Sequence, residues 1–320
     1  MKYITIPSTD LQISKLGLGT VNAGISWDYN RMCNIIGNYL ELGGNFLDTA
    51  RVYSDWIPGD TGRSEKLLGR WIQNNKEKRD KIYISTKGGH HNVENPNVKR
   101  VCREEVEKDL DLSLKTLHVD YIDLYFYHRD DQDIPVKDLI ECMETFKRKG
   151  KIKYYGCSNW STKRIAEAER YANSNGYTGF VLNQAHFNIG ALYQKPLEDQ
   201  SMVQMDIAMR EYHKKNKFIL AMPYSSVANG FFHKLLNGQI SDIEKSYFYT
   251  EKNIRIGKAL FEALKNGKAS LTQLLLGFFE IQDFQCIPLY SPQNPLQIIE
   301  ACKTFDMSFE KKEYDFVYQL

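Results

Sequence analysis

Short apolar runs rich in Ile, Val, Tyr and Phe alternate along the chain with amphipathic stretches. This alternation is typical of successive βα units, in which each strand is followed by a helix that packs on the sheet. The candidate strands are residues 16–18, 45–48, 82–87, 121–128, 152–158, 180–184, 218–224 and 285–289. Because eight parallel strands close into a barrel, the pattern predicts an α/β fold, a (β/α)8 TIM barrel.

The stretches between these runs carry apolar residues at helical spacing. Val98, Val106 and Leu110 show it within residues 97–117, and further helices are predicted over 31–42, 64–73, 136–149, 162–174, 205–215 and 270–282. The interval 225–269 is unusually long, so we expect a loop and helix insertion there, with a helix over 253–264, on the functional rim between strands 7 and 8. Residues 2–14 alternate like a two-stranded β-hairpin that plugs the bottom of the barrel.

Composition narrows the class of protein. No Pro- or Gly-rich linker divides the 320 residues, so a single barrel domain over 1–320 is expected. The 42 Lys and Arg nearly balance the 40 Asp and Glu, without a block of one sign, which argues against a nucleic-acid partner. No apolar run approaches the roughly 18 residues of a membrane helix, and the first residues do not resemble a signal peptide. A cytoplasmic protein with no membrane partner is expected, and the oligomeric state stays open.

Six cysteines are spread along the chain without a CxxC pair, which is typical of reduced, packed thiols. The neighbouring His90 and His91 have no carboxylate or third histidine close by in the sequence, so no metal site is expected.

Polar residues close three of the predicted strands: Asp48, Lys87 and His128. Active sites of such barrels lie at the carboxyl ends of the strands, so these side chains should share one part of the rim, with Tyr53 in the loop after Asp48. Each alone is more often a helix cap, a solvated charge or a structural histidine. Together they suit proton transfer to a carbonyl oxygen.

Tyr53 is the expected acid in this group. A phenol with a pKa of about 10 is a weak acid at neutral pH, and a neighbouring ammonium lowers its pKa by favouring the phenolate. Lys87 would supply that ammonium, Asp48 would hold Lys87 charged and in place, and His128 would donate a hydrogen bond to the carbonyl oxygen.

Several segments resemble successive signatures of the aldo-keto reductase family, in order and spacing: LGLGT at 16–20, LDTARVYSDW followed by GRSEKLLGRW, ISTK at 84–87, DYIDLYFYHRDD at 120–131 and YYGCSNW at 154–160. The resemblance covers nearly the whole chain. It implies that Asp48, Tyr53, Lys87 and His128 form a catalytic tetrad. The implied reaction is hydride transfer from a reduced nicotinamide to an aldehyde or ketone, such as a sugar or polyol-derived carbonyl.

The same resemblance implies cofactor contacts. Ser158, Asn159 and Gln184 match residues that bind the nicotinamide carboxamide, Tyr224 matches the tyrosine that stacks on its ring, and Ser225 matches a pyrophosphate contact. Without the resemblance, Ser158 and Asn159 would be read as the turn that caps the next helix, and Tyr224 as an aromatic packed at the barrel mouth. No GxGxxG follows a strand, so a Rossmann site is not expected.

The last loop departs from the family pattern. Glu300 matches the adenine-binding glutamate, but Gln293 stands where a cation for the 2′-phosphate is expected and Ala301 where an Asn is expected. Ser291 and Asn294 can still donate hydrogen bonds to a phosphate. NADP is therefore the expected cofactor, with NAD as the alternative.

Substrate-pocket walls are predicted from rim residues: Trp27, Trp56, His90, His91, Arg129, Phe187, Phe231 and Phe232. Two other classes of protein stay open. One is a nicotinamide-binding regulatory subunit that resembles potassium-channel beta subunits and turns over slowly or not at all. The other is a barrel hydrolase or lyase that uses Asp48, Lys87 and His128 without a nicotinamide.

Overall fold

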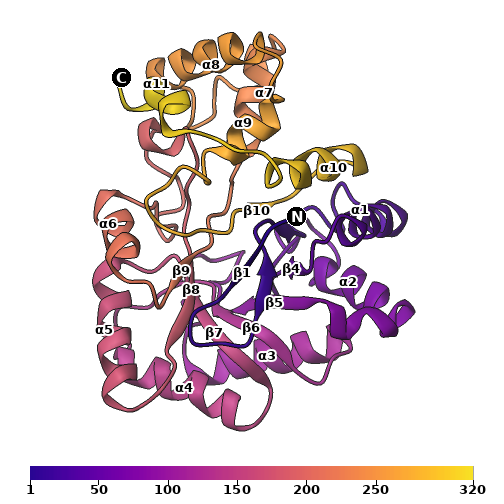
Figure 1. Ribbon diagram of the computed structural model, residues 1–320. Helices are drawn as coiled ribbons and strands as arrows, with labels where there is room; N and C mark the ends of the chain where they lie inside the picture. Colours follow the sequence, from indigo (N-terminus) through magenta and orange to yellow (C-terminus); the bar gives the residue numbers. More distant parts are fainter. Residues whose placement is uncertain (320) are drawn as a thin grey trace.

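The computed structural model describes residues 1–319 and contains one sheet of eight parallel strands, in the order β10-β3-β4-β5-β6-β7-β8-β9 (Figure 1). Backbone N–H groups of Ile287 and Leu289 donate to the carbonyls of Ala221 and Pro223, at 3.0 and 2.8 Å, so the last strand segment also meets β9 and closes the ring. The predicted (β/α)8 barrel is confirmed. Its strands are β3 Gly17–Gly19, β4 Phe46–Asp48, β5 Tyr83–Gly88, β6 Ile122–Tyr127, β7 Ile152–Ser158, β8 Phe180–Gln184, β9 Leu220–Ala221 and β10 Leu289–Tyr290.

Helices surround the sheet (Figure 1). They are α1 Tyr29–Glu41, α2 Arg63–Asn74, α3 Arg103–Leu117, α4 Val136–Arg148, α5 Thr162–Ser174, α6 Ile207–Lys215, α7 Phe231–Leu236, α8 Glu251–Leu264, α9 Leu271–Gly277, α10 Pro295–Thr304 and α11 Asp315–Tyr318. Several begin at a side chain that accepts from a backbone N–H of the first turn, as Asp28, Ser161 and Asp206 do for α1, α5 and α6.

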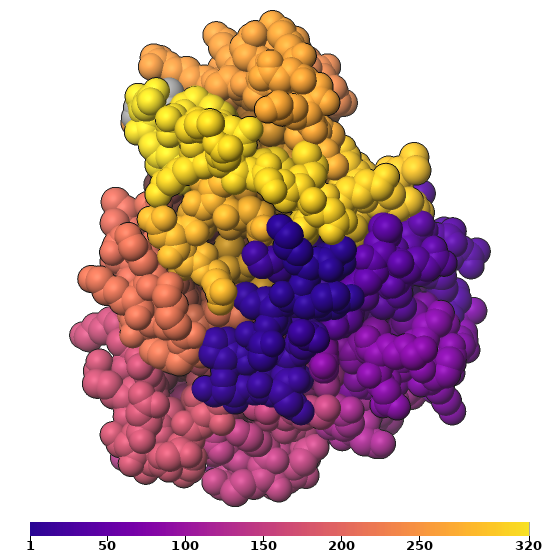
Figure 2. Space-filling model, viewed as in Figure 1, coloured from indigo at the N-terminus to yellow at the C-terminus, as the bar shows by residue number. Residues whose placement is uncertain are grey.

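The N-terminal hairpin plugs one end of the barrel, as predicted. β1 (Tyr3–Thr5) and β2 (Gln12–Ser14) pair antiparallel. Ile6, Leu11 and Ile13 are fully buried against apolar side chains from the barrel interior. Figure 2 shows this indigo segment packed between the early helices and the C-terminal third of the chain. The plugged end leaves the carboxyl ends of the strands for the site.

Two predicted helices are longer than the observed ones. α3 begins only at Arg103, and residues 92–98 before it form a loop closed by the Asn92 N–H on the Val98 carbonyl. Val98 is exposed, so its match to helical spacing was wrong. α9 ends at Gly277, where the chain passes into turns that lead to β10.

Two predicted strands are shortened by proline. β9 stops before Pro223, and β10 starts after Pro288, because proline has no N–H to donate to the sheet.

The insertion 225–269 follows β9 and forms the top of the view in Figure 1. The predicted helix over 253–264 is confirmed as α8, whereas α7 and two short 3-10 turns, Ala228–Gly230 and Ile240–Asp242, were not predicted. α7 packs on α8. Within residues 1–319, every helix is too short or too polar to cross a membrane.

Candidate active site

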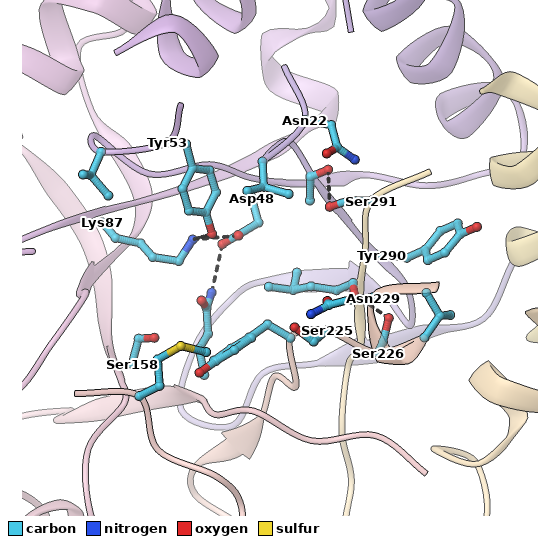
Figure 3. A pocket seen from close by; sticks show the side chains of 18 of the residues that line it. Asn22, Asp48, Tyr53, Lys87, Ser158, Ser225, Ser226, Asn229, Tyr290 and Ser291 are labelled. Atoms are coloured by element: carbon cyan, nitrogen blue, oxygen red, sulfur yellow. Dashed lines mark hydrogen bonds and ion pairs between the residues drawn. The ribbon is translucent and has the colours of Figure 1, made fainter. Parts of the chain in front are cut away.

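Four polar side chains meet at the carboxyl ends of β4, β5 and β6, and Figure 3 shows three of them, Asp48, Tyr53 and Lys87. Asp48 is the last residue of β4, Lys87 is the second-to-last residue of β5, and His128 directly follows β6. The parallel register pairs Asp48 with Ser85, which brings the ends of β4 and β5 level. Tyr53, from the loop after β4, leans back over them, as predicted.

Lys87 is the centre of the group. Its ammonium donates to Asp48 Oδ2 at 2.7 Å, to the Thr49 carbonyl at 2.7 Å and to the Tyr53 hydroxyl at 3.0 Å. Its side chain is 1% exposed. Burial is the largest single influence and favours the neutral amine, but the charges and hydrogen bonds of Asp48 and Tyr53 together outweigh it and raise the pKa of Lys87 above its ordinary value. Lys87 is therefore a fixed positive charge beside the phenol.

The sequence pattern predicts that Lys87 lowers the pKa of Tyr53, and the structure corrects the net direction. Although the ring lines the cavity, the surrounding protein raises the pKa of Tyr53 above its ordinary value through loss of water, and the Asp48 carboxylate adds to that rise. Lys87 opposes both effects with the predicted sign, yet it does not outweigh burial. Tyr53 is thus a phenol at neutral pH, a state that can donate a proton.

His128 completes the group as a neutral imidazole. Burial, followed by the neighbouring His90 and Arg129, lowers the pKa of His128 well below its ordinary value. Its ring centroid lies 5.9 Å from that of Tyr53 and 4.7 Å from that of His90. Within residues 1–319 its Nδ1 has no hydrogen-bond partner. Because His128 also lines the cavity, a neutral imidazole faces that space.

A cavity of about 1070 Å³ opens beside these side chains. Its volume lies slightly above the usual range for ligand pockets, roughly 300 to 1,000 Å³. Tyr53 and Lys87 lie at one side of the view in Figure 3, and Asn22, Tyr290 and Ser291 at the other. The cavity therefore extends from Tyr53 and Lys87, past Asp48, to Ser291 and Tyr290.

Asn159 lines this cavity, but its side chain is already fully bonded. Its Nδ2 donates to the His128 carbonyl at 3.2 Å and to the Ser158 hydroxyl at 3.0 Å. Its Oδ1 accepts from the Val203 N–H at 3.0 Å and from the Tyr224 hydroxyl at 2.7 Å. Asn159 sits at a φ of +62°, in the left-handed region that Asn tolerates. Its side chain holds Ser158 and Tyr224 in place at the cavity wall, and its contact with a cofactor stays a prediction.

Gln184, the last residue of β8, lines the cavity and turns its amide nitrogen to Asp48. The Nε2 to Oδ1 distance is 2.9 Å. Asp48 Oδ1 also accepts from the Ser85 hydroxyl at 2.6 Å. Asp48 is thus held by Gln184, Ser85 and Lys87 together.

The other end of the cavity is formed by the loop after β10 and by the insertion. Ser225, Ser291 and Gln293 line it, as predicted. Asn294 and Glu300 do not line it. Asn294 Oδ1 accepts from the Gln297 N–H and caps α10.

Lys234, on α7, lines the same end and was missed by the sequence reasoning. Of the cavity-lining lysines and arginines in residues 1–319, Lys87 pairs with Asp48 and Arg129 with Asp199, whereas Lys234 makes no ion pair. Its position in a helix that had not been predicted left no signal for it.

The predicted substrate walls divide into two groups. Trp56, His90, His91 and Arg129 line the cavity near Tyr53. Trp27, Phe187, Phe231 and Phe232 are buried and do not line it, so their assignment was wrong. The Trp27 indole donates to the Pro292 carbonyl at 2.8 Å, and Phe187 packs against Phe278, Phe279 and Phe284.

Arg129 has partners that the sequence reasoning missed. Its guanidinium donates to Asp199 at 3.0 Å and to Ser201 at 2.7 Å. Asp199 and Met202 also line the cavity, from a loop without any periodic pattern. The wall near Tyr53 therefore carries a charge pair, Arg129 and Asp199, and two histidines, His90 and His91.

The chain is a (β/α)8 barrel with four polar side chains grouped at the carboxyl ends of its strands. A family model described as the Aldo/keto reductase family matches residues 15–320, and the chain belongs to that family.

The individual relatives are about 30% identical to this chain and match it over part of its length. A Bacillus subtilis protein described as an uncharacterized oxidoreductase, YrpG, is 30% identical, with 59% of each chain covered. A probable voltage-gated potassium channel subunit beta of Arabidopsis thaliana is 31% identical, over 62% of this chain and 58% of its own. Norsolorinic acid reductase A of Aspergillus parasiticus is 30% identical, over 58% of this chain and 49% of its own. The chain thus spans about half to three fifths of the length of these relatives.

Proposed function

We propose that this protein reduces an aldehyde or ketone to the alcohol with a reduced nicotinamide cofactor, and that Tyr53 is the proton donor. The observation that carries the proposal is the buried chain of Asp48, Lys87 and Tyr53, with distances of 2.7 and 3.0 Å, at the wall of the long cavity. Family membership and the oxidoreductase relatives support it.

The residues present fit a nicotinamide dinucleotide. Ser158 and Gln184 offer a polar wall beside the four site residues, Tyr224 offers an aromatic face, and Lys234 offers a positive charge at the far end. When bound, the reduced nicotinamide supplies the hydride.

The protein residues then handle the proton. The carbonyl oxygen of the substrate accepts hydrogen bonds from the Tyr53 hydroxyl and from His128. As negative charge grows on that oxygen, Tyr53 transfers its proton, and the ammonium of Lys87, 3.0 Å away, stabilises the phenolate that remains. Asp48 keeps Lys87 charged and aimed at Tyr53.

NADP is the preferred cofactor in this proposal. Gln293 lines the end of the cavity where a cation was expected, and Lys234 from the insertion supplies a cation at that end instead. A charged hydrogen bond to phosphate is worth about 1.5 to 3 kcal/mol, enough to favour NADP over NAD.

The substrate class follows from the wall near Tyr53. Trp56, which is 47% exposed, offers an aromatic face, and His90, His91 and the Arg129–Asp199 pair offer polar contacts. These groups suit a carbonyl that also carries hydroxyl groups, such as a sugar or polyol-derived carbonyl.

The direct test is a panel of aldehydes, ketones and polyols, followed at the nicotinamide absorbance with NADPH and NADH. The proposal requires sustained turnover of at least one carbonyl and loss of that turnover in Tyr53→Phe. Binding of neither nucleotide would favour the barrel hydrolase or lyase instead.

A nicotinamide-binding regulatory subunit is the second candidate, because one relative is described as a potassium channel subunit beta. That function predicts a single burst of cofactor oxidation without further turnover. Sustained turnover on any substrate of the panel excludes it.

A further inference from the structure

His186 is a buried histidine that follows β8 and lies between the cavity wall and the insertion 225–269. Its backbone N–H donates to the Val203 carbonyl at 2.9 Å, and its carbonyl accepts from the Met205 N–H at 3.0 Å. Its side chain is fully buried, and within residues 1–319 neither Nδ1 nor Nε2 has a hydrogen-bond partner. The main chain of His186 is therefore fixed, whereas its imidazole has no polar contact.

Three aromatic rings enclose this imidazole. Its centroid lies 5.5 Å from that of Tyr224, 5.8 Å from that of Tyr247 and 5.8 Å from that of Phe248. Tyr224 lines the cavity, whereas Tyr247 and Phe248 belong to the insertion. A buried polar group without a partner costs free energy that an apolar ring of similar shape would not. Packing alone therefore does not explain a histidine at this position.

Only the neutral imidazole suits these surroundings. Burial lowers the pKa of His186 to about 4, and its own backbone opposes this only in part. The titratable groups that face the ring are the phenols of Tyr224 and Tyr247. Burial raises the pKa of both, so they stay neutral at acid and neutral pH. No charged side chain within residues 1–319 shifts the pKa of His186, so a proton on its ring has to be stabilised by water.

The insertion is the cover that can admit this water. Tyr247 and Phe248 lie in a turn between the 3-10 turn Ile240–Asp242 and α8. Tyr224 is held more firmly, because its N–H donates to a carbonyl at the end of β8 at 3.2 Å and its hydroxyl donates to Asn159 at 2.7 Å. Displacement of the turn would hydrate the His186 ring and leave the barrel strands in place.

The same turn is tied to the cavity. The Tyr247 hydroxyl accepts from Asn229 Nδ2 at 2.8 Å, and Asn229 lines the cavity together with Ser225 (Figure 3). Asn229 and Ser225 have positive φ angles, +51° and +56°, a region that is costly for residues other than Gly and persists only where the surroundings hold it. Loss of the Tyr247 contact therefore loosens a strained segment of the cavity wall.

We propose that His186 is a pH-sensitive switch: its neutral ring holds the turn of Tyr247 and Phe248 closed against Tyr224, and its protonated ring releases that turn and loosens the end of the cavity that the insertion forms. This inference rests on the proposed function, since it takes the ligand of that end to be the nicotinamide nucleotide. The opening of the turn needs no ligand and can be measured in the free protein.

The expected size of the effect follows from two pKa values. The His186 ring has a pKa of about 4 when closed in, and a hydrated histidine has a pKa of about 6.5. The open form therefore binds the proton first, so the closed form is most stable above pH 6.5 and loses stability as the pH falls toward 4. Between pH 7 and pH 5 the population of the open form should increase roughly twenty-fold.

Limited proteolysis of the free protein at pH 7 and pH 5 measures this opening. Each rate is divided by the rate for an unfolded peptide of residues 240–250, which removes the pH dependence of the protease. Where closing is faster than cleavage, the rate follows the open population, so cleavage within 240–250 should be roughly twenty-fold faster at pH 5. Equal normalised rates at the two pH values, or equally fast cleavage in the strands of the barrel, would overturn the proposal.

His186→Phe keeps an aromatic ring and cannot bind a proton. Its normalised cleavage rates at pH 7 and pH 5 should be equal, and an acid increase that persists in this variant would refute the role of His186. The wild-type comparison needs no variant, so the proposal is tested even where His186→Phe does not fold.

His213, on α6, provides the matched control. It is also buried, and burial lowers its pKa to about 4 as well. Its ring is bonded to Asn183 at 3.0 Å and to the Ile219 carbonyl at 3.2 Å, and neither partner belongs to the insertion. His213→Gln should therefore keep the acid-induced cleavage of the insertion. Loss of that cleavage in His213→Gln would show that opening does not depend on His186 alone, contrary to the proposal.

The nucleotide separates this inference from the proposed function. NADPH that binds the closed form should suppress cleavage at pH 5. If the insertion opens with acid in the wild type and not in His186→Phe, but NADPH neither binds nor protects, the switch stands and the proposed function is wrong. If NADPH is oxidised by a carbonyl in sustained turnover but cleavage does not depend on pH, only the role of His186 is wrong.

Discussion

Replacement of Lys87 by Met removes the buried ammonium while filling most of its space. The Lys87 nitrogen lies 3.0 Å from the Tyr53 hydroxyl. Coulomb's law with an effective dielectric constant of about 20 gives an interaction of about 5 kcal/mol for full charges at this distance. In a transition state with half of the proton transferred, the Tyr53 oxygen carries about half a charge, so Lys87 stabilises it by about half of this energy. Carbonyl reduction should therefore slow by roughly 10²-fold.

A double variant separates the loss of rate in Lys87→Met from a loss of folding stability. Asp48 loses its counter-ion, and breaking one half of a buried pair costs about 3 to 5 kcal/mol of folding free energy, lessened here by the bonds from Ser85 and Gln184. The double variant Asp48→Asn with Lys87→Met removes both charges. It should recover much of the stability and none of the rate.

The assay is single-turnover reduction of a carbonyl by prebound NADPH, together with thermal unfolding of the same samples. The pH dependence of alcohol oxidation gives an independent test. Lys87 opposes the rise in the pKa of Tyr53, so its loss should move the midpoint of alcohol oxidation to higher pH. Full activity of Lys87→Met with an unshifted profile would refute the electrostatic role.

Three further predictions concern other parts of the molecule. Gln293→Arg should raise the affinity for NADPH by roughly ten-fold and leave the affinity for NADH nearly unchanged. Lys234→Met should lower the affinity for NADPH and make it less dependent on salt. Fluorescence titrations at two ionic strengths measure both changes. Equal shifts for both nucleotides on Gln293→Arg would show that residue 293 does not face the 2′-phosphate. The insertion 225–269 should be cut by a protease in the free protein and protected by cofactor, since it lines the cavity; equal cutting would remove the idea of a closing flap. His186→Phe should stabilise the protein at acid pH.

The reason for the last prediction is the environment of His186. It is fully buried against Tyr224, Tyr247 and Phe248, and within residues 1–319 neither ring nitrogen has a hydrogen-bond partner. Burial lowers the pKa of His186 to about 4. The unfolded chain, with a histidine pKa of about 6.5, binds the proton first, so stability is lost as pH falls below that value. At pH 5 this costs about 2 kcal/mol, which should appear as a higher Tm of His186→Phe. An equal loss of Tm on acidification in both proteins would contradict it.

Much of the barrel could be predicted from the sequence, because its strands are continuous apolar runs and its helices are amphipathic. β7, β8 and α5 lie at their predicted residues. The errors lie where a loop or a proline overrides the pattern, as in the loop 92–98 before α3 and at Pro223 after β9.

The grouping of Asp48, Lys87 and His128 was also predictable, since strand ends of a parallel barrel meet on one rim. The partners of Gln184, Asn159 and Trp27 were not. The bond from Gln184 to Asp48 joins residues 136 positions apart, and that from Trp27 to Pro292 spans 265 positions. Which end of an amide is already occupied depends on such contacts, and no local pattern encodes them.

The most direct measurement is the rate of carbonyl reduction by Tyr53→Phe with NADPH already bound. Phenylalanine keeps the ring and removes only the hydroxyl that lies 3.0 Å from Lys87. The account predicts that NADPH affinity is nearly unchanged, while the single-turnover rate falls by roughly 10²-fold or more. A rate close to that of the wild type would contradict the assignment of Tyr53 as the proton donor.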